Sequence, residues 1–387
     1  MTRIYLDNAA TSWPKPPAVI DAVQRYMRDV GAPYGRAGYA EATQAGRIVG
    51  QARQGVAELL GAREPEHVVF TSSGSDALNL AIRGVLRPGD HVVTSVCEHN
   101  SILRPLRWLS ETAGVTVDYV PCDGAGHVSP DDVRAVLRPE TRLAAFLHVS
   151  NVTGAVQPVA EIGAVVREHG ALYLVDAAQS LGHMPVDVLQ WGADLVAAPG
   201  HKGLLGPLGT GVLWIRPGVE QHLEPLRFGG TGTQSDDERQ PDSLPDKFEA
   251  GNHNLPGIAG LAAATQWLQQ QTPGQVAAHH LMLTARLLSG LRDIPGLTPY
   301  GPPAPSARGS VVSLTLQGYD PQELAALLDA SHGVQCRAGL HCAPRMHEAL
   351  GTKAGGGALR LSVGCFTTAE EVDTAIAALQ EAAAIGG

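Results

Sequence analysis

The chain has 387 residues, of which 44% are hydrophobic and 17% are charged, and its formal net charge is −10 at pH 7. This balance is typical of a well-packed soluble protein and unlike that of a disordered chain. The acidic excess, with no cluster of Lys and Arg, argues against nucleic-acid binding. No apolar run is long enough to cross a bilayer, and the N-terminus lacks a signal-peptide core, so we expect a cytoplasmic protein without membrane association.

The cysteines are odd in number and include no C-x-x-C pair, so the sequence predicts neither a disulfide framework nor a metal site. Buried thiols are the default interpretation, although at least one could be reactive. The five cysteines are Cys97, Cys122, Cys336, Cys342 and Cys365.

Between residues 65 and 216, short apolar runs alternate with helical patterns such as 76–86 and 160–168. This alternation predicts an α/β fold with a mostly parallel, seven-stranded sheet flanked by helices. In such sheets ligands gather at the carboxyl ends of the strands. The expected strands are 67–70, 91–94, 116–120, 143–147, 171–175, 194–197 and 211–215.

Residues 229–254 show no periodicity, and a loop of that length in a compact domain is usually functional. A long helix is expected at 258–271. Beyond it the pattern predicts a smaller C-terminal α+β domain, with strands at 310–314 and 359–363 and helices at 322–329 and 369–383. We therefore divide the chain into an N-terminal segment packing near the active site and small domain, a large domain, and a linking helix with the small domain: 1–15, 16–258 and 259–387.

A glycine-rich loop at 198–211 places Lys202 beside His201, directly after an apolar run. The lysine could be an ordinary surface charge, or it could form a Schiff base with a carbonyl cofactor. Asp176 ends the preceding strand and could cap a helix, bind a metal or pair with a protonated ring nitrogen. A lysine and an acid in this relation are what pyridoxal phosphate requires.

Other expected strand ends carry polar side chains as well. Residues 72–76 could bind an anion at a helix start or simply cap the helix. His99 could lie flat against a cofactor ring or be a polar loop residue, and Asn151 could donate to a phenolate or carboxylate oxygen. We expect five distant segments to meet at one ligand, through Gly74 and Ser75, His99, Asn151, Asp176 and Gln179, and His201 and Lys202.

Together these residues resemble the class V aminotransferase group of fold-type I pyridoxal phosphate enzymes, and most of all the cysteine desulfurases. The likeness runs nearly end to end and implies that the large domain binds the cofactor. Its most discriminating motif is 337–343, because related transaminases and epimerases do not need the cysteine there. The other matching motifs are 6–11, 98–100, 148–154, 175–180, 200–203 and 248–251.

The resemblance implies a role for each site residue. Lys202 would hold the cofactor as a Schiff base and then act as acid and base at the substrate α-carbon, while Asp176 would keep the pyridine nitrogen protonated. The remaining cofactor contacts would be Gln179 at the ring oxygen, His99 stacked on the ring, Asn151, and Gly74, Ser75 and His201 at the phosphate. The substrate contacts would be Arg360, which grips the carboxylate, with Asn151, Ala10 and Arg337.

Cys342 matches the nucleophile of the family. Arg337, His341 and the start of a helix at 344–350 would favour its thiolate. The short span from 337 to 344 resembles the compact-loop, Suf-type desulfurases. The other candidate thiols fit this role less well: Cys97 and Cys365 in or beside strands, and Cys336.

The resemblance implies conversion of L-cysteine to L-alanine, with a persulfide on Cys342 passed to an acceptor protein or thiol. It also implies a homodimer in which 229–254 reaches the neighbouring site. Alternatives are another class V enzyme (a selenocysteine lyase, C–S lyase, aminotransferase or epimerase on a specialised amino acid) or a non-catalytic scaffold.

The chain departs from the family pattern at three positions. Pro199 stands where relatives often have a phosphate-binding Ser or Thr, two residues before His201. Tyr39 replaces a common histidine near the substrate entrance. Asn252 stands where many relatives place a Thr that reaches the neighbour's phosphate. These departures leave the phosphate contacts and the substrate preference open.

Overall fold

The computed structural model describes residues 3–35, 37–272 and 274–386. Arg36, which belongs to the Tyr39 motif, and the chain-end residues of the first and last expected domains lie outside the described residues. Among the helices described, none combines the length and the apolar character needed to span a membrane.

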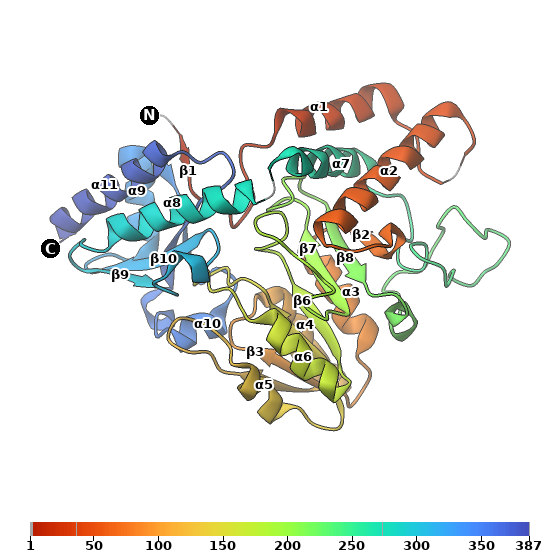
Figure 1. Cartoon of the computed structure of the whole chain (residues 1–387), viewed down its shortest axis with the longest axis horizontal. Helices are drawn as coiled ribbons and strands as arrows, with labels where there is room; N and C mark the ends of the chain where they lie inside the picture. The colour runs from red at the N-terminus through yellow and green to blue at the C-terminus, as the bar shows by residue number, and fades with distance from the viewer. Residues whose placement is uncertain (1–2, 36, 273, 387) are drawn as a thin grey trace.

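A seven-stranded sheet forms the centre of the larger unit (Figure 1). Its order is β2-β8-β7-β6-β5-β3-β4. Strands β4, β3, β5, β6 and β7 run parallel, whereas β8 is antiparallel to both of its neighbours. The predicted fold class is therefore confirmed. The strands are β2 Val68–Thr71, β3 His91–Ser95, β4 Thr116–Val120, β5 Thr141–Leu147, β6 Leu172–Asp176, β7 Leu195–Pro199 and β8 Gly211–Ile215.

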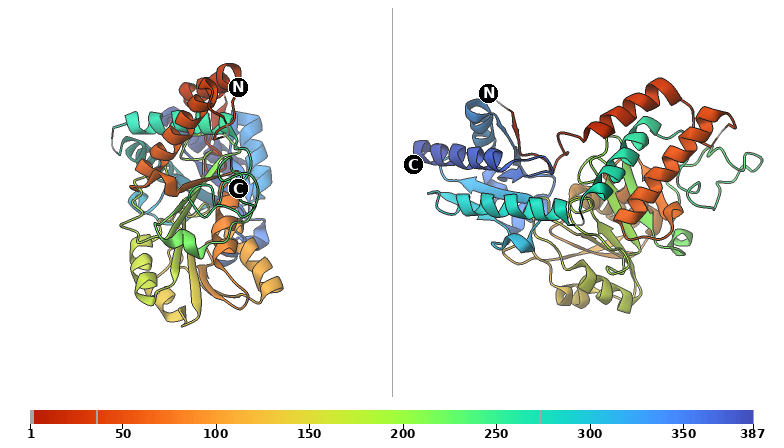
Figure 2. Two further views of the ribbon diagram at one scale, coloured as in Figure 1. Left: turned by 90° about the vertical axis from the view of Figure 1, so that its right-hand side faces the viewer. Right: turned by 45° about the horizontal axis from the view of Figure 1, so that its top comes forward.

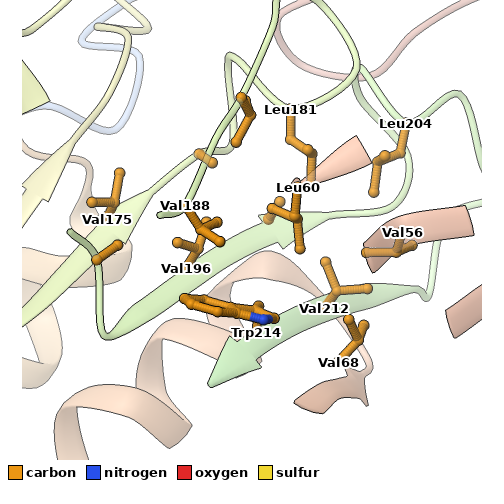
Figure 3. Close-up of a cluster of buried hydrophobic side chains, with 14 of the residues drawn as sticks. Val56, Leu60, Val68, Val175, Leu181, Val188, Val196, Leu204, Val212 and Trp214 are labelled. Carbon is orange, nitrogen blue, oxygen red and sulfur yellow. The ribbon is translucent and has the colours of Figure 1, made fainter. Parts of the chain in front are cut away.

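Helices cover both faces of this sheet because the buried strands contribute apolar side chains to two cores, one on each face. In β8, Val212 and Trp214 face one core, while Leu213 and Ile215 face the other. Figure 3 shows the first core, where side chains of β6, β7 and β8 meet Val56 and Leu60. The helices of this unit are α1 Pro17–Arg25, α2 Ala40–Leu59, α3 Gly74–Val85, α4 Asn100–Ala113, α5 Pro130–Val136, α6 Val159–His169 and α7 Leu255–Gln270.

Helix α7 packs against α1 and α2. It spans the expected boundary at residue 258, and the division into domains stays a prediction. Before α7, the described residues 229–254 contain neither helix nor strand, as expected, and form the extended green loop at the right of Figure 1.

The C-terminal unit is built on an antiparallel sheet of order β12-β13-β10-β9. Figure 2 shows the N-terminal segment leaving this unit and crossing to the helices of the larger one. The segment begins as strand β1 (Ile4–Tyr5), which pairs in parallel with β11 (Val334–Gln335). The other elements are β9 Leu297–Tyr300, β10 Val311–Leu316, β12 Arg337–Gly339, β13 Ala358–Ser362, α8 Gln275–Leu291, α9 Pro321–His332, α10 Pro344–Ala349 and α11 Ala369–Gly386.

Candidate active site

A cavity of about 200 Å³ lies at the carboxyl ends of β5, β6 and β7. Cys342 lies outside it, on an adjoining groove that shares Ser75, His99 and Ser101 with the cavity. Parallel strands end at one edge of a sheet, which explains why distant segments meet here. The predicted site residues that line the cavity are Ala10, Gly74, Ser75, His99, Asn151, Asp176, Gln179, His201, Lys202, Arg337 and Arg360.

Lys202 lies in the tight loop that follows β7. The loop needs its glycines, because a Cβ on Gly200 would lie 2.1 Å from the hydroxyl oxygen of Thr210. Burial lowers the pKa of Lys202 to about 8, although Asp176 acts in the opposite direction. More of this amine is therefore neutral near physiological pH than in an exposed lysine, and a neutral amine can attack a carbonyl.

The N-terminal segment holds the peptide that carries Lys202. The carbonyl oxygen of His201 accepts hydrogen bonds from Ser12 N at 3.1 Å, from Thr11 Oγ1 at 3.1 Å and from Lys15 Nζ at 2.8 Å. Ser12 Oγ also donates to the carbonyl oxygen of Lys202 at 2.9 Å. Sequence reasoning missed Ser12 and Lys15, because neither residue carries a periodic or motif signal.

Asp176 is the last residue of β6 and is 5% exposed. Its Oδ1 accepts a hydrogen bond from the backbone N–H of Ala178 at 2.9 Å, and burial raises the pKa of the carboxyl group. A buried carboxylate gains from a cationic partner. Gln179, which follows on the same loop, donates through Nε2 to the carbonyl oxygen of Ala9 at 3.0 Å.

Hydroxyl groups and a helix start lie at another end of the cavity. Ser75 Oγ lies 2.6 Å from Ser101 Oγ, and the ring of His99 accepts from Ser101 N at 3.0 Å. Burial lowers the pKa of His99 to about 4, so its ring is neutral. Nδ1 of His201 is buried and has no partner among the described residues.

Pro199 packs against the start of α3 at this end of the cavity. A Cβ on Gly74 would lie 3.0 Å from the Pro199 ring nitrogen and Cδ, a tight contact that favours glycine there. Pro199 itself has no side-chain hydroxyl group to offer a ligand. The hydroxyls and the helix N-terminus that remain suit an anion.

Arg360, on β13, is 1% exposed. Its Nη2 donates to Asp7 Oδ1 at 2.8 Å and its Nη1 to the carbonyl oxygen of Asn151 at 3.2 Å. Of its five N–H donors three remain available, and Nε has no partner among the described residues. Asn151 donates through Nδ2 to the carbonyl oxygen of His341 at 2.7 Å, while its buried Oδ1 has no described partner. The free N–H groups of Arg360 suit a carboxylate.

Cys342 lies on a strained turn. His341 and Cys342 have φ values of 48° and 58°, a left-handed backbone that non-glycine residues seldom adopt. Asn100 N holds the turn by donating to the Cys342 carbonyl oxygen at 2.7 Å. The guanidinium Nη2 of Arg337 lies 3.7 Å from Cys342 Sγ, and helix α10 begins two residues later.

His341 differs from expectation, because burial lowers its pKa and its ring is neutral. Of the two side chains expected to favour the thiolate, only Arg337 brings positive charge to Cys342. Burial raises the pKa of both Cys336 and Cys365 to about 12, which makes these thiols poor nucleophiles.

The residues present fit pyridoxal phosphate. The cavity offers an amine on Lys202, a buried carboxyl group on Asp176 and hydroxyls at a helix start. Buried polar atoms are nearly always hydrogen-bonded in folded proteins, so the unpaired His201 Nδ1 and Asn151 Oδ1 call for a polar ligand.

Comparisons with known proteins agree with this geometry. The model of the family Aminotransferase class-V matches residues 4–375. A protein named probable cysteine desulfurase from Methanothermobacter thermautotrophicus is 38% identical over 99% of this chain and 96% of its own length. One from Pseudomonas aeruginosa is 37% identical over 97% of this chain and 92% of its own.

Solved structures give the same result. The apo structure of a cysteine desulfurase from Thermococcus onnurineus has a TM-score of 0.91 at 33% identity, and covers 99% of this chain and 95% of its own. A cysteine desulfurase from Escherichia coli has a TM-score of 0.89 at 29% identity, and covers 100% of this chain and 96% of its own. The chain therefore belongs to the class V aminotransferase family, within its group of cysteine desulfurases.

Proposed function

We propose that this chain is a pyridoxal-phosphate-dependent cysteine desulfurase, which converts L-cysteine to L-alanine and holds the released sulfur on Cys342. One observation carries the proposal. A cysteine with an arginine guanidinium 3.7 Å from its sulfur stands at the mouth of a cavity that contains both a buried lysine and a buried arginine.

When bound, pyridoxal phosphate supplies an electron sink for the bonds broken at an amino acid. Lys202 would hold it and would move the α-proton of the substrate through Nζ, for which a pKa of about 8 is well matched. Asp176 would pair with the ring nitrogen, and His99 would contact the ring. His201, Gly74 and Ser75 would hold the phosphate. Of the substrate contacts, Arg360 and Asn151 bind the carboxylate, with Ala10 and Arg337 beside it.

The sulfur step uses Cys342 as the nucleophile. Its thiolate forms an S–S bond with the substrate sulfur, the Cβ–S bond of the substrate breaks, and the electron pair of that bond stays with the carbon side. Protonation there completes L-alanine, and Cys342 carries the persulfide. The guanidinium Nη2 of Arg337 faces this sulfur at 3.7 Å.

Alanine formation tests the proposal. The wild type is given L-cysteine with dithiothreitol, beside parallel reactions with selenocysteine and cysteine sulfinate. C342A should lose alanine formation from cysteine. C336A, which removes a half-buried thiol near by, should keep it. Full activity of C342A would overturn the persulfide mechanism. Activity on selenocysteine alone would favour the selenocysteine lyase alternative.

We infer a cytoplasmic homodimer. The family resemblance supports the dimer, and two-fold pairs are the commonest soluble assemblies. Phe228 directly precedes the 229–254 loop, which we propose reaches the neighbouring site. The five cysteines all lie in the described part of the chain and are free thiols, as suits a reducing compartment. Mass measurement in solution tests the dimer.

A further inference from the structure

The groove beside Cys342, with a volume of about 500 Å³, leads away from the active-site cavity along two neighbouring helices, α3 and α4 (Figure 1). Residues four apart on a helix share a face. The lining residues follow this spacing, with Ser75, Asn79 and Arg83 on α3 and Asn100, Arg104 and Trp108 on α4. The groove therefore has two regular walls, with the thiol of Cys342 at the end next to the cavity.

Positive charge concentrates in this groove. Of the described residues that line it, none is Asp or Glu, although the chain carries a net charge of −10. Arg83 and Arg104 are exposed, and neither forms an ion pair within the described residues. The neighbouring Arg107, which does not line the groove, pairs with Glu111 at 2.6 Å. Arg83 and Arg104 therefore present unpaired positive charges to a ligand that enters the groove.

An aromatic side chain completes the far end. Trp108 is 48% exposed, and the guanidinium of Arg83 lies over its ring at 4.8 Å from the centroid. Tryptophan and arginine are the side chains that most often anchor protein–protein interfaces. A small thiol needs only to reach Cys342 and gains nothing from a tryptophan two helical turns farther along α4. The groove is therefore suited to a polypeptide.

We propose that this groove docks a protein sulfur acceptor whose thiol is flanked by acidic side chains. The inference rests on the proposed function and names the partner of the same site. Acidic groups would pair with Arg83 and Arg104 while the acceptor thiolate attacks the outer sulfur of the Cys342 persulfide. A new S–S bond forms on the acceptor, the old one breaks, and its electron pair leaves on the Cys342 thiolate. One sulfur atom moves without any external oxidant or reductant.

Two short peptides test the proposal, each with a single cysteine, flanked in one by aspartates and in the other by lysines. The holoenzyme is loaded with L-cysteine, freed of excess substrate and mixed with each peptide, and persulfidated peptide is followed by mass spectrometry. The acidic peptide should react about tenfold faster, and this preference should fade in high salt. Flanking lysines lower a thiol pKa, so intrinsic reactivity favours the basic peptide and makes the test stringent.

Variants with reversed charge test the role of the two arginines. R83E/R104E should reverse the preference between the peptides, so that the basic peptide becomes the better acceptor. R107E, a change of the same kind on the same helix but outside the groove, should leave the preference as in the wild type. Equal rates for both peptides in the wild type, or an unchanged preference in R83E/R104E, would overturn the proposal.

Alanine formation by the wild type with dithiothreitol, which carries no charge, separates this inference from the function on which it rests. If alanine forms but the peptides are not distinguished, the docking proposal alone fails. If no alanine forms, the proposed function itself fails.

Discussion

Arg360 shows how a single residue can carry charge inside the protein. It is 1% exposed, and Asp7 accepts from its Nη2 at 2.8 Å. Removing one partner of a buried ion pair costs more than the pair contributes, because the other charge is left in a poor solvent. Asp7 therefore both supports the fold and holds the guanidinium that we propose binds the substrate carboxylate.

This arrangement predicts the effect of D7N. The free energy of unfolding should fall by about 2 kcal/mol, since the neutral amide compensates the buried charge less well. The KM for L-cysteine should rise as the guanidinium loses its anchor. Urea denaturation and steady-state kinetics measure the two effects. D373N, which breaks the exposed pair between Arg286 and Asp373 in the same unit, is the control and should change stability little. Equal effects of D7N and D373N would contradict the prediction.

The buried amine of Lys15 should make the free energy of unfolding depend on pH. Burial lowers its pKa from the usual 10.5 to about 8. The unfolded chain therefore binds more protons than the folded chain between pH 8 and pH 10.5, so the contribution of Lys15 to stability rises with pH across this window. In the cofactor-free protein we compare the free energy of unfolding of K15M with that of the wild type. The value for K15M minus the value for the wild type should be roughly 2 kcal/mol larger at pH 7.5 than at pH 10.5. A difference that stays constant with pH would contradict this prediction.

At the scale of single residues, the sequence identifies the residues proposed to act on the ligand. It does not identify the residues that hold them in place. Lys202, Asp176 and Asn151 could be found because each follows an expected strand, and strand ends in parallel sheets converge. Lys15 could not, because its partner His201 lies 186 residues away and no local pattern joins them. The same holds for the ion pair of Asp7 and Arg360, which lie 353 residues apart.

Among the elements, helix α2 contains two glycines in different surroundings, Gly50 and Gly55. Gly50 is exposed, and a Cβ there would meet nothing within 4 Å. Gly55 is buried where α2 packs on α7, and a Cβ there would lie 2.3 Å from the hydroxyl oxygen of Thr265. Only the second glycine is required by packing.

The matched substitutions should therefore have opposite signs. G50A should raise the free energy of unfolding by roughly 0.5–1 kcal/mol, because alanine loses less backbone entropy on folding. G55A should lower it by about 1–3 kcal/mol, because α2 and α7 must separate to admit the methyl group. Denaturant unfolding of the two variants measures both. A stabilising effect of G55A would show that the packing of α2 on α7 is looser than the structure indicates.

The strands of the large sheet were predicted and are confirmed. All seven strands of the large sheet agree with their expected ranges to within two residues, because each is an apolar run bounded by polar turns. Strand β9 and helices α1, α2 and α8 were not among the predicted elements. The short strands β1, β11 and β12 were not predicted either. Two or three residues cannot show a period, and their pairing depends on partners brought from elsewhere in the chain.

For the whole molecule, alternation of strands and helices was enough to predict the fold class. The way the N-terminal segment joins the two units was beyond such reasoning. Leu6 packs in the core of the C-terminal unit, while Thr11, Ser12 and Lys15 bond the backbone around Lys202 in the larger one. One short segment thus sets the position of the proposed substrate arginine relative to the proposed cofactor lysine.

The path of the N-terminal segment between the two units affects the order in which the protein can fold. Residues 4–7 are synthesised well before their partners Val334 and Arg360, and Asp7 and Arg360 lie 353 residues apart. Domains generally fold as the chain emerges, so the larger unit can form, with Thr11, Ser12 and Lys15 on the Lys202 loop, while residues 4–7 still lack their partners. A nascent chain at that stage has Lys202 but not Arg360. The proposed active site is therefore complete only after the C-terminal unit has been synthesised and has bound residues 4–7.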